Sequence, residues 1–337
     1  MASEEYLLIE SIQFISALAI GFAATYTLTP PISRFMERHG RVGVDVHKLD
    51  KPKIPEMCGL SIVAGVTASA LTVIMLKPEY LIEAAAFIAS TLTVAAVGVL
   101  DDTVVLGPRL KPALTALGAA PILILSVYNS HPVLPFIGGT RLTIIYPILI
   151  PIALAVTSNA VNMLDVYNGS MTGTCSVAAS AIIVSMLLAG RWAPASLAAG
   201  LLGGLIAFHI FNCYPAKVFA GDVGSLYVGA SLGVVTILGR VEVAAVAAMM
   251  PHIMNAFYGL AAMGRLYERR EAKSRPVRIL EDGRLEATED PGAPVTLARM
   301  ILAGNPMEEY QVTREMIILS IVSGILAIAT QILIVWR

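Results

Sequence analysis

Three stretches of the chain carry acidic and amide side chains that could hold a metal ion or a phosphate group. Asp101 and Asp102 stand side by side at the end of an apolar segment, and Lys111 follows shortly after. Two adjacent carboxylates repel each other and resist desolvation, so they normally need a cation or a basic partner. From this pair alone, a solvated helix end with Lys111 as a neutralising neighbour explains the residues about as well as a functional site does.

The second stretch presents polar side chains on one face of a helix. Asn159, Asn162 and Asp165 recur every three residues, which places them on the same side. Oxygen-bearing side chains suit Mg²⁺, a hard cation that also binds substrate phosphates. A helix C-cap would explain Asn168, which precedes Gly169, but it would not explain the other three. We therefore favour a functional interpretation of this face.

The third stretch is a turn in which Asp222 lies next to glycine. Gly221 and Gly224 let the backbone turn and come close to a ligand, and Asp222 can ligate a metal ion. Asp222 could instead be no more than the N-cap of the next helix, because Asp is favoured at that position. For this stretch taken alone, capping is the stronger interpretation.

Basic residues in two further polar segments could bind phosphate oxygens. Lys48 lies in the first of these segments, and Arg275 and Arg278 lie in the last. Clustered Lys and Arg bind phosphates, and Arg does so through its planar fork. For most basic residues of the chain, membrane topology or contact with anionic lipids is the better explanation. We exempt Lys48 and Arg275 or Arg278 from it.

The composition places these residues in a membrane protein. Of 337 residues, 56% are hydrophobic and only 14% are charged, whereas soluble domains usually have about 25% charged residues. This excludes an ordinary soluble protein, and no basic stretch indicates binding to nucleic acid. The three cysteines lack the spacing of zinc ligands.

The apolar segments predict the elements that position the polar stretches. Crossing about 30 Å of hydrocarbon takes roughly 20 apolar residues in a helix. The sequence therefore predicts an all-α polytopic membrane protein with about ten transmembrane helices, in a single domain over residues 1–337 with a cytoplasmic loop subdomain at about 265–314. The predicted spans lie near residues 7–29, 58–76, 80–100, 112–129, 142–158, 173–190, 195–212, 224–239, 243–264 and 315–336.

The distribution of basic residues predicts the orientation. Eighteen of the 23 Lys and Arg residues fall in connections on one side of the predicted spans, which the positive-inside rule assigns to the cytoplasm. Both termini then face outward, and the polar stretches lie at the cytoplasmic ends. A secondary transporter of a nucleotide sugar or another anion is the main alternative, but it would carry charges near mid-span. A purely structural or lipid-binding protein would give the polar loops no reason to converge.

In this order, the motifs resemble the polyprenyl-phosphate N-acetylhexosamine-1-phosphate transferase family, of the glycosyltransferase 4 type. The family includes the enzyme that starts N-glycan synthesis and the bacterial phospho-MurNAc-pentapeptide transferase. The run at 211–222 and the triplet at 54–56 are more similar to the eukaryotic and archaeal dolichol branch, and an archaeal source would fit. The matching segments are Lys48 to Glu56 with Gly59, Leu100 to Asp102 with Arg109 and Lys111, Asn159 to Gly173, and Phe211 to Leu226.

The resemblance implies an activity and a set of site residues. The chain would be an integral membrane enzyme, in the cell membrane of a prokaryote, that transfers a sugar 1-phosphate, most simply GlcNAc-1-phosphate, from a UDP-sugar to a polyprenyl or dolichyl phosphate. It would release UMP and start lipid-linked glycan synthesis for protein glycosylation, in contact with membrane lipids, without nucleic acid, and as a candidate homodimer. Mg²⁺, or Mn²⁺ in its place, would be held by Asn162 and Asp222. The candidate catalytic residues are Asp101, Asp102, Lys111 and Asp165, and the candidate substrate-binding residues are Lys48, Glu56, Asn159, Asn168, Arg275 and Arg278.

Overall fold

The computed structural model describes residues 2–263 and 274–336, and these residues are mostly helical. The helices are α1 (Ala2–Arg38), α2 (Leu60–Leu76), η1 (Pro78–Tyr80), α3 (Leu81–Val104), α4 (Leu110–Thr115), η2 (Ala116–Ala119), α5 (Ala120–Ile124), α6 (Ile145–Leu164), α7 (Ser170–Leu188), α8 (Trp192–Asn212), α9 (Gly221–Gly239), α10 (Glu242–Ala248), α11 (Met250–Met263), α12 (Leu297–Ile301) and α13 (Glu309–Val335). The strands are β1 (Val42–Val44), β2 (Lys53–Pro55), β3 (Val133–Leu134), β4 (Gly138–Gly139), β5 (Val277–Ile279) and β6 (Leu285–Ala287).

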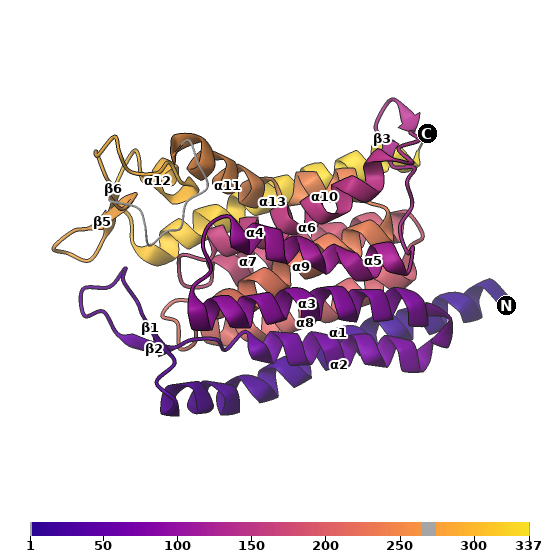
Figure 1. Ribbon diagram of the computed structural model, residues 1–337, viewed down its shortest axis with the longest axis horizontal. Helices are drawn as coiled ribbons and strands as arrows, with labels where there is room; N and C mark the ends of the chain where they lie inside the picture. The colour runs from indigo at the N-terminus through magenta and orange to yellow at the C-terminus, as the bar shows by residue number, and fades with distance from the viewer. Residues whose placement is uncertain (1, 264–273, 337) are drawn as a thin grey trace.

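The long helices form one bundle around α9. In α9 every residue from Val223 to Gly239 is buried, and α9 packs against α3, α6 and α8. Figure 1 shows both chain ends at one end of the bundle, with β1, β2, β5, β6 and α12 at the other. The polar stretches of the sequence therefore emerge at the end that carries these hairpins.

Several helices are suited to a membrane. Within the described ranges, seven helices are long and apolar enough to cross it, or eight if α10 and α11, bent by 68°, count as one span. The polytopic helical architecture is thus confirmed. Two of the ten predicted spans, α2 and the segment from α4 to α5, are shorter apolar helices. The second is interrupted by the 3₁₀ turn η2, and α5 then begins with Pro121 in its first turn.

Three short hairpins were not predicted from the sequence. β1 pairs with β2, β3 with β4 and β5 with β6, all antiparallel. Strands of two or three residues are too short to show an alternating pattern. The β5–β6 hairpin and α12 pack on a small apolar cluster that includes Leu285, Leu297 and Val312. This segment falls within the predicted subdomain at 265–314, of which residues 265–273 lie outside the described part.

Two glycines bring α2 and α3 against the start of α9. A Cβ atom at Gly98 would lie 2.4 Å from the Cα of Val223, and one at Gly59 would lie 2.3 Å from the Cα of Gly224. Such distances are far below van der Waals contact, so only glycine allows this approach. Gly224 therefore serves helix packing, and its predicted approach to a ligand stays a prediction. Because Gly98 lies one turn before Asp101, the acidic pair reaches the start of α9.

Candidate active site

Lys111 connects three of the predicted site residues. Its Nζ atom lies 2.6 Å from Asp101 Oδ2 and 3.1 Å from Asp222 Oδ1, and it donates a 3.0 Å hydrogen bond to Asn162 Oδ1. Lys111 and Asp101 are buried, at 5% and 3% exposure. Residues from α3, α4, α6 and α9 thus meet at one point, as the sequence predicted for the acidic, amide and basic side chains.

Asp222 and Asn162 lie beside each other at this point. The Asn162 amide nitrogen donates to Asp222 Oδ1, and it also donates a 2.8 Å hydrogen bond to Ser225 Oγ. Ser225 lies one turn after Asp222 on α9, and its hydroxyl donates to the carbonyl of Gly221. Gly221 has a φ of +72°, which favours glycine and confirms the predicted turn. Asp222 is therefore placed by a glycine turn and by its hydrogen bond with Asn162 of α6.

Asp102 faces the backbone of α9. Its two carboxylate oxygens accept hydrogen bonds of 2.8 Å from the Asp222 N–H and 2.9 Å from the Val223 N–H. The first N–H groups of a helix lack partners within the helix and carry a partial positive charge, so a carboxylate stabilises them. Asp102 caps α9 from a different helix, and Asp222 itself is not the capping residue. This geometry favours a positioning role for Asp102.

Asp101 has both oxygens engaged in a different way. Its Oδ1 accepts the N–H of Leu106 at 2.5 Å, while Oδ2 contacts Lys111. The first bond holds the turn that leads from α3 toward α4, and Lys111 is carried on α4. Asp101 therefore sets both the position of Lys111 and the path of the chain that carries it.

Asn159 joins α4 to α6 one turn away from Asn162. Its amide donates 2.9 Å to Thr115 Oγ1 and 2.8 Å to the carbonyl of Ala155. Lys111 and Thr115, four residues apart on α4, thus pair with Asn162 and Asn159, three residues apart on α6. The helical spacing predicted the shared face of the two asparagines, whereas Thr115 was not singled out.

A cavity of about 1280 Å³ contains the site. Asp101, Lys111, Asn159, Asn162, Asp165 and Asp222 line it, together with Glu56 and Asn168. An apolar part of its wall comes from η2, α6 and α11, with Ala116, Ile152, Val156, Phe257 and Leu260 among its residues. One continuous space therefore joins a charged end to a hydrocarbon-like groove. Asp102 and Lys48 are not among the lining residues.

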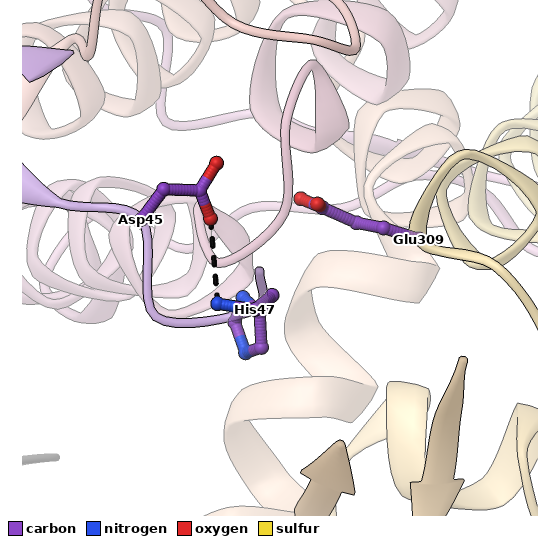
Figure 2. Close-up of side chains that lie close together, drawn as sticks. All are labelled: Asp45, His47 and Glu309. Atoms are coloured by element: carbon purple, nitrogen blue, oxygen red, sulfur yellow. Dashed lines mark hydrogen bonds between the residues drawn. The ribbon is translucent and has the colours of Figure 1, made fainter. Parts of the chain in front are cut away.

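Lys48 belongs to a second cluster beside this cavity. Its ammonium group contacts Asp45, donates a 2.8 Å hydrogen bond to Asn168 Oδ1, and lies 3.5 Å from Glu309 Oε2. Burial lowers the pKa of Lys48, but the hydrogen bond with Asp45 and the charge of Glu309 outweigh burial and raise the pKa overall. Figure 2 shows the carboxylates of Asp45 and Glu309 turned toward each other. Together with His47 they offer ligand atoms within 4.8 Å of one another, but the Lys48 ammonium already supplies the cation, so we assign no metal there.

Asn168 is the centre of that second cluster. Its side-chain oxygen also accepts the N–H of Ala216 at 2.7 Å, and its own N–H donates 2.8 Å to Glu309 Oε1. These bonds join the loop between β1 and β2, the turn before α7, and the start of α13. Lys48 and Asn168, each predicted to bind substrate, are thus hydrogen-bonded to each other, and their polar groups fasten loops to one another. Asp45 and Glu309 were missed because single acidic residues far apart in sequence give no local signal.

The two predicted arginines lie on the β5–β6 side of the cavity. Arg275 and Arg278 both line it and are exposed. Arg278 is paired with Glu286 across the hairpin, with Nε donating 2.6 Å to Oε2. A surface pair of this kind contributes little to stability and leaves the guanidinium accessible. The structure therefore places both arginines at the cavity but not in contact with the cluster around Lys111.

The donor set around Asp222 fits a divalent cation of the Mg²⁺ type. Asp101, Asp102 and Asp222 carry three carboxylates near a single ammonium group, that of Lys111, so the cluster has an excess of negative charge. The remaining nearby donors are the carboxamide of Asn162 and the hydroxyl of Ser225, both oxygen ligands that hard cations accept. Oxygen atoms of Asp101, Asp222 and Asn162 all contact the Lys111 ammonium, so a cation held by Asp222 and Asn162 would share these acceptors with Lys111.

Comparisons with known proteins find relatives over most of the chain. Residues 84–240 match the model of glycosyl transferase family 4. The chain is 32% identical over 286 residues to a protein of Saccharolobus solfataricus named as a UDP-N-acetylglucosamine–dolichyl-phosphate N-acetylglucosaminephosphotransferase, covering 80% of this chain and 88% of that relative. It is 30% identical over 289 residues to a protein of Methanocaldococcus jannaschii named as a glycosyltransferase, covering 86% and 87%. It is 28% identical over 245 residues to the phospho-N-acetylmuramoyl-pentapeptide-transferase of Bacillus licheniformis, covering 67% and 75%.

Proposed function

The chain belongs to glycosyl transferase family 4, and on that premise we propose that it transfers N-acetylglucosamine 1-phosphate from UDP-N-acetylglucosamine to a dolichyl or other polyprenyl phosphate. The products are UMP and a lipid-linked sugar pyrophosphate, which starts a lipid-linked glycan. The observation that carries the proposal is the cavity, in which the charged cluster around Lys111 opens into an apolar groove. A water-soluble nucleotide sugar and a membrane-bound acceptor need both environments in one space.

The acceptor phosphate is the nucleophile in this proposal. One of its oxygens forms a bond to the β-phosphorus of the UDP-sugar, and the bond from that phosphorus to the bridging oxygen breaks, so that UMP leaves with the electron pair. At pH 7 a phosphate monoester is already largely ionised, because its second pKa is about 6. A strong general base is therefore not required, and catalysis depends on positioning and on neutralising charge.

Each residue of the cluster has a defined task. Lys111 brings a positive charge to the transferring phosphates, and Asp101 holds its ammonium group in place. Asp102 holds the backbone of α9 so that Asp222 faces the cavity. Asp222 and Asn162 would bind Mg²⁺, which supplies neutralising charge to the pyrophosphate when bound. Asp165, at the C-cap of α6, lines the same cavity and stays a candidate catalytic residue.

The two substrates would occupy different ends of the cavity. The prenyl chain would lie along the apolar wall of η2, α6 and α11. The uridine and sugar would lie under the hairpins, where Glu56, Arg275 and Arg278 line the cavity. Lys48, with Asn168, would act by fastening the β1–β2 loop at the rim, in place of the phosphate contact expected from its charge alone.

The membrane topology is part of the same proposal. Helices occur at each of the ten predicted positions, and we propose ten crossings, with the shorter helices α2 and α4–α5 among them. The basic loops would lie in the cytoplasm, where UDP-sugars are made, and both termini outside. A secondary transporter is disfavoured because the charged residues of the candidate site line a cavity together with residues of the β1–β2 and β5–β6 hairpins, which Figure 1 shows at one end of the bundle. We keep a homodimer as a proposal that size measurement in detergent would test.

A direct assay tests the function. Purified full-length protein would be incubated with UDP-GlcNAc, a polyprenyl phosphate and Mg²⁺, and UMP and lipid-linked product would be measured. We expect both products in equal amounts, with none when the polyprenyl phosphate is omitted. Asp50→Ala, at an exposed position outside the cavity, is the matched control for acidic-residue variants and should be nearly normal. UDP-GlcNAc transport into vesicles without UMP release would refute the proposal.

A further inference from the structure

A second cavity lies at the end of the bundle opposite the candidate active site. Its volume is about 320 Å³, and we call it the distal cavity. It is enclosed by the turn between α7 and α8, the turn between α9 and α10, the loop before β3 and the last turns of α13. In Figure 1 β3 and the C-terminus lie at the end away from β5 and β6. Nothing in the proposed transfer reaction uses this cavity.

Two arginines from different turns line the distal cavity. They are Arg191, which precedes α8, and Arg240, which follows α9. Within the described ranges no carboxylate lies at salt-bridge distance from either guanidinium. Glu242 is the acidic residue of the lining, and its carboxylate accepts a hydrogen bond from the Tyr146 hydroxyl. The charge of Arg240 acts on Glu242, so the lining holds one carboxylate beside two guanidinium groups and keeps a net positive charge. Burial together with Arg240 lowers the pKa of Arg191.

A buried polar side chain also lacks a partner at this cavity. Gln331 on α13 lines it, is 2% exposed, and has a side-chain oxygen without any hydrogen-bond partner in the described part of the chain. A buried polar atom left unpaired is costly, so it signals a missing partner. Because the oxygen and nitrogen of a carboxamide can exchange places by rotation, Gln331 can present an N–H group to an anion.

The backbone at Arg240 supports a role for its side chain. Arg240 is the C-cap of α9 with a φ of +57°, in the left-handed region where glycine or asparagine is favoured. A long side chain at such a position is held against the local preference of the backbone. Strain of this kind points to a use for the side chain.

We propose that the distal cavity binds a phosphate group, held by the guanidinium groups of Arg191 and Arg240 and by the carboxamide of Gln331. Guanidinium forks match phosphate oxygens and form charge-assisted hydrogen bonds. The phosphate could be free or could belong to a lipid headgroup, and the apolar wall with Leu188 and Val335 suits the second source. Binding would join α7–α8, α9–α10 and α13 at this end of the bundle.

The test compares probes that differ in their phosphate. Purified protein in detergent would be titrated with inorganic phosphate, with phosphatidylglycerol, and with diacylglycerol as the lipid that lacks phosphate. Bound ligand would be counted by native mass spectrometry, and the melting temperature would be followed in parallel, since a ligand that binds the folded state raises it. Stabilisation by inorganic phosphate identifies a free anion as sufficient. Stabilisation by phosphatidylglycerol alone identifies a lipid headgroup.

Arg240→Gly is the decisive variant. Glycine suits the left-handed backbone, so this variant should melt no lower than the wild type without ligand, while its affinity for the phosphate probe should fall about tenfold or more. Arg191→Gln should weaken binding similarly, and Arg141→Gln, an exposed arginine outside the cavity, should leave it unchanged. Equal binding of the probes by wild type and Arg240→Gly would overturn the proposal. So would wild-type protein that binds neither phosphate probe better than diacylglycerol.

Discussion

Asp102→Asn separates a positioning residue from one that touches the reacting groups. In the wild type, two backbone N–H groups at the start of α9 donate to the Asp102 carboxylate at 2.8 and 2.9 Å. Hydrogen bonds to a charged group contribute about 1.5–3 kcal/mol each. Asparagine keeps one neutral acceptor and turns its NH₂ group toward the other N–H. We therefore expect a loss of about 2–4 kcal/mol in the free energy of unfolding.

The same variant should lose turnover, because the backbone that it releases carries Asp222. Turnover would be measured as UMP release, and the free energy of unfolding by denaturation in mixed micelles. Asp222→Asn should behave differently, with turnover reduced about 100-fold or more and the free energy of unfolding changed by about 1 kcal/mol or less. Asp50→Asn serves as the exposed control for both measurements. An Asp102→Asn protein with wild-type stability and no turnover would refute the positioning argument.

Three further predictions follow from the contacts of the site. Removing divalent cations with EDTA should abolish UMP release, and Mg²⁺ or Mn²⁺ should restore it, whereas full activity in EDTA would contradict the assignment of Asp222. Gly98→Val should abolish turnover and lower the free energy of unfolding by about 1–3 kcal/mol, because even the Cβ atom of valine would lie 2.4 Å from the Cα of Val223. Normal UMP release by this variant would show that α3 and α9 need not touch. Lys48→Met should destabilise the protein by about 3–5 kcal/mol, because it leaves the buried carboxylates of Asp45 and Glu309 without a counter-ion. The folded-state pKa of Lys48 is raised above its ordinary 10.5. The contribution of Lys48 to the free energy of unfolding is therefore fully present below about pH 10.5 and is lost at higher pH. Denaturation measured at varied pH should show this loss in the wild type but not in Lys48→Met.

The helices could be read from the sequence because each depends on a local pattern. Long apolar runs predict spans whatever their neighbours are, and a helix was found at each predicted position. The number of membrane spans did not follow from hydropathy in the same way, because the segment from α4 to α5 is broken by a 3₁₀ turn and the segment from α10 to α11 is bent by 68°. Those breaks depend on how the segments pack, and hydropathy does not record packing.

The candidate site was predicted as a set of residues but not as a geometry. Asn159 and Asn162 were found by their helical spacing, and the acidic pair by the cost of placing two charges together. Asp102 turns to the backbone of α9, whereas Asp101 turns to Lys111. Two identical residues next to each other in the sequence gave no sign of this difference. Successive residues of a helix point about 100° apart, and only the position of the next helix decides what each one meets.

By itself, the sequence determined that this chain lies in a membrane, that it is helical, and which polar stretches are candidates for the chemistry, since hydropathy and motif order are properties of the chain alone. The tertiary structure decided which of those polar groups touch one another. It joined Lys48 to Asn168 and Glu309, and it set two arginines around the distal cavity. Those contacts join residues far apart in the chain, and their free energy exists only when the helices have packed.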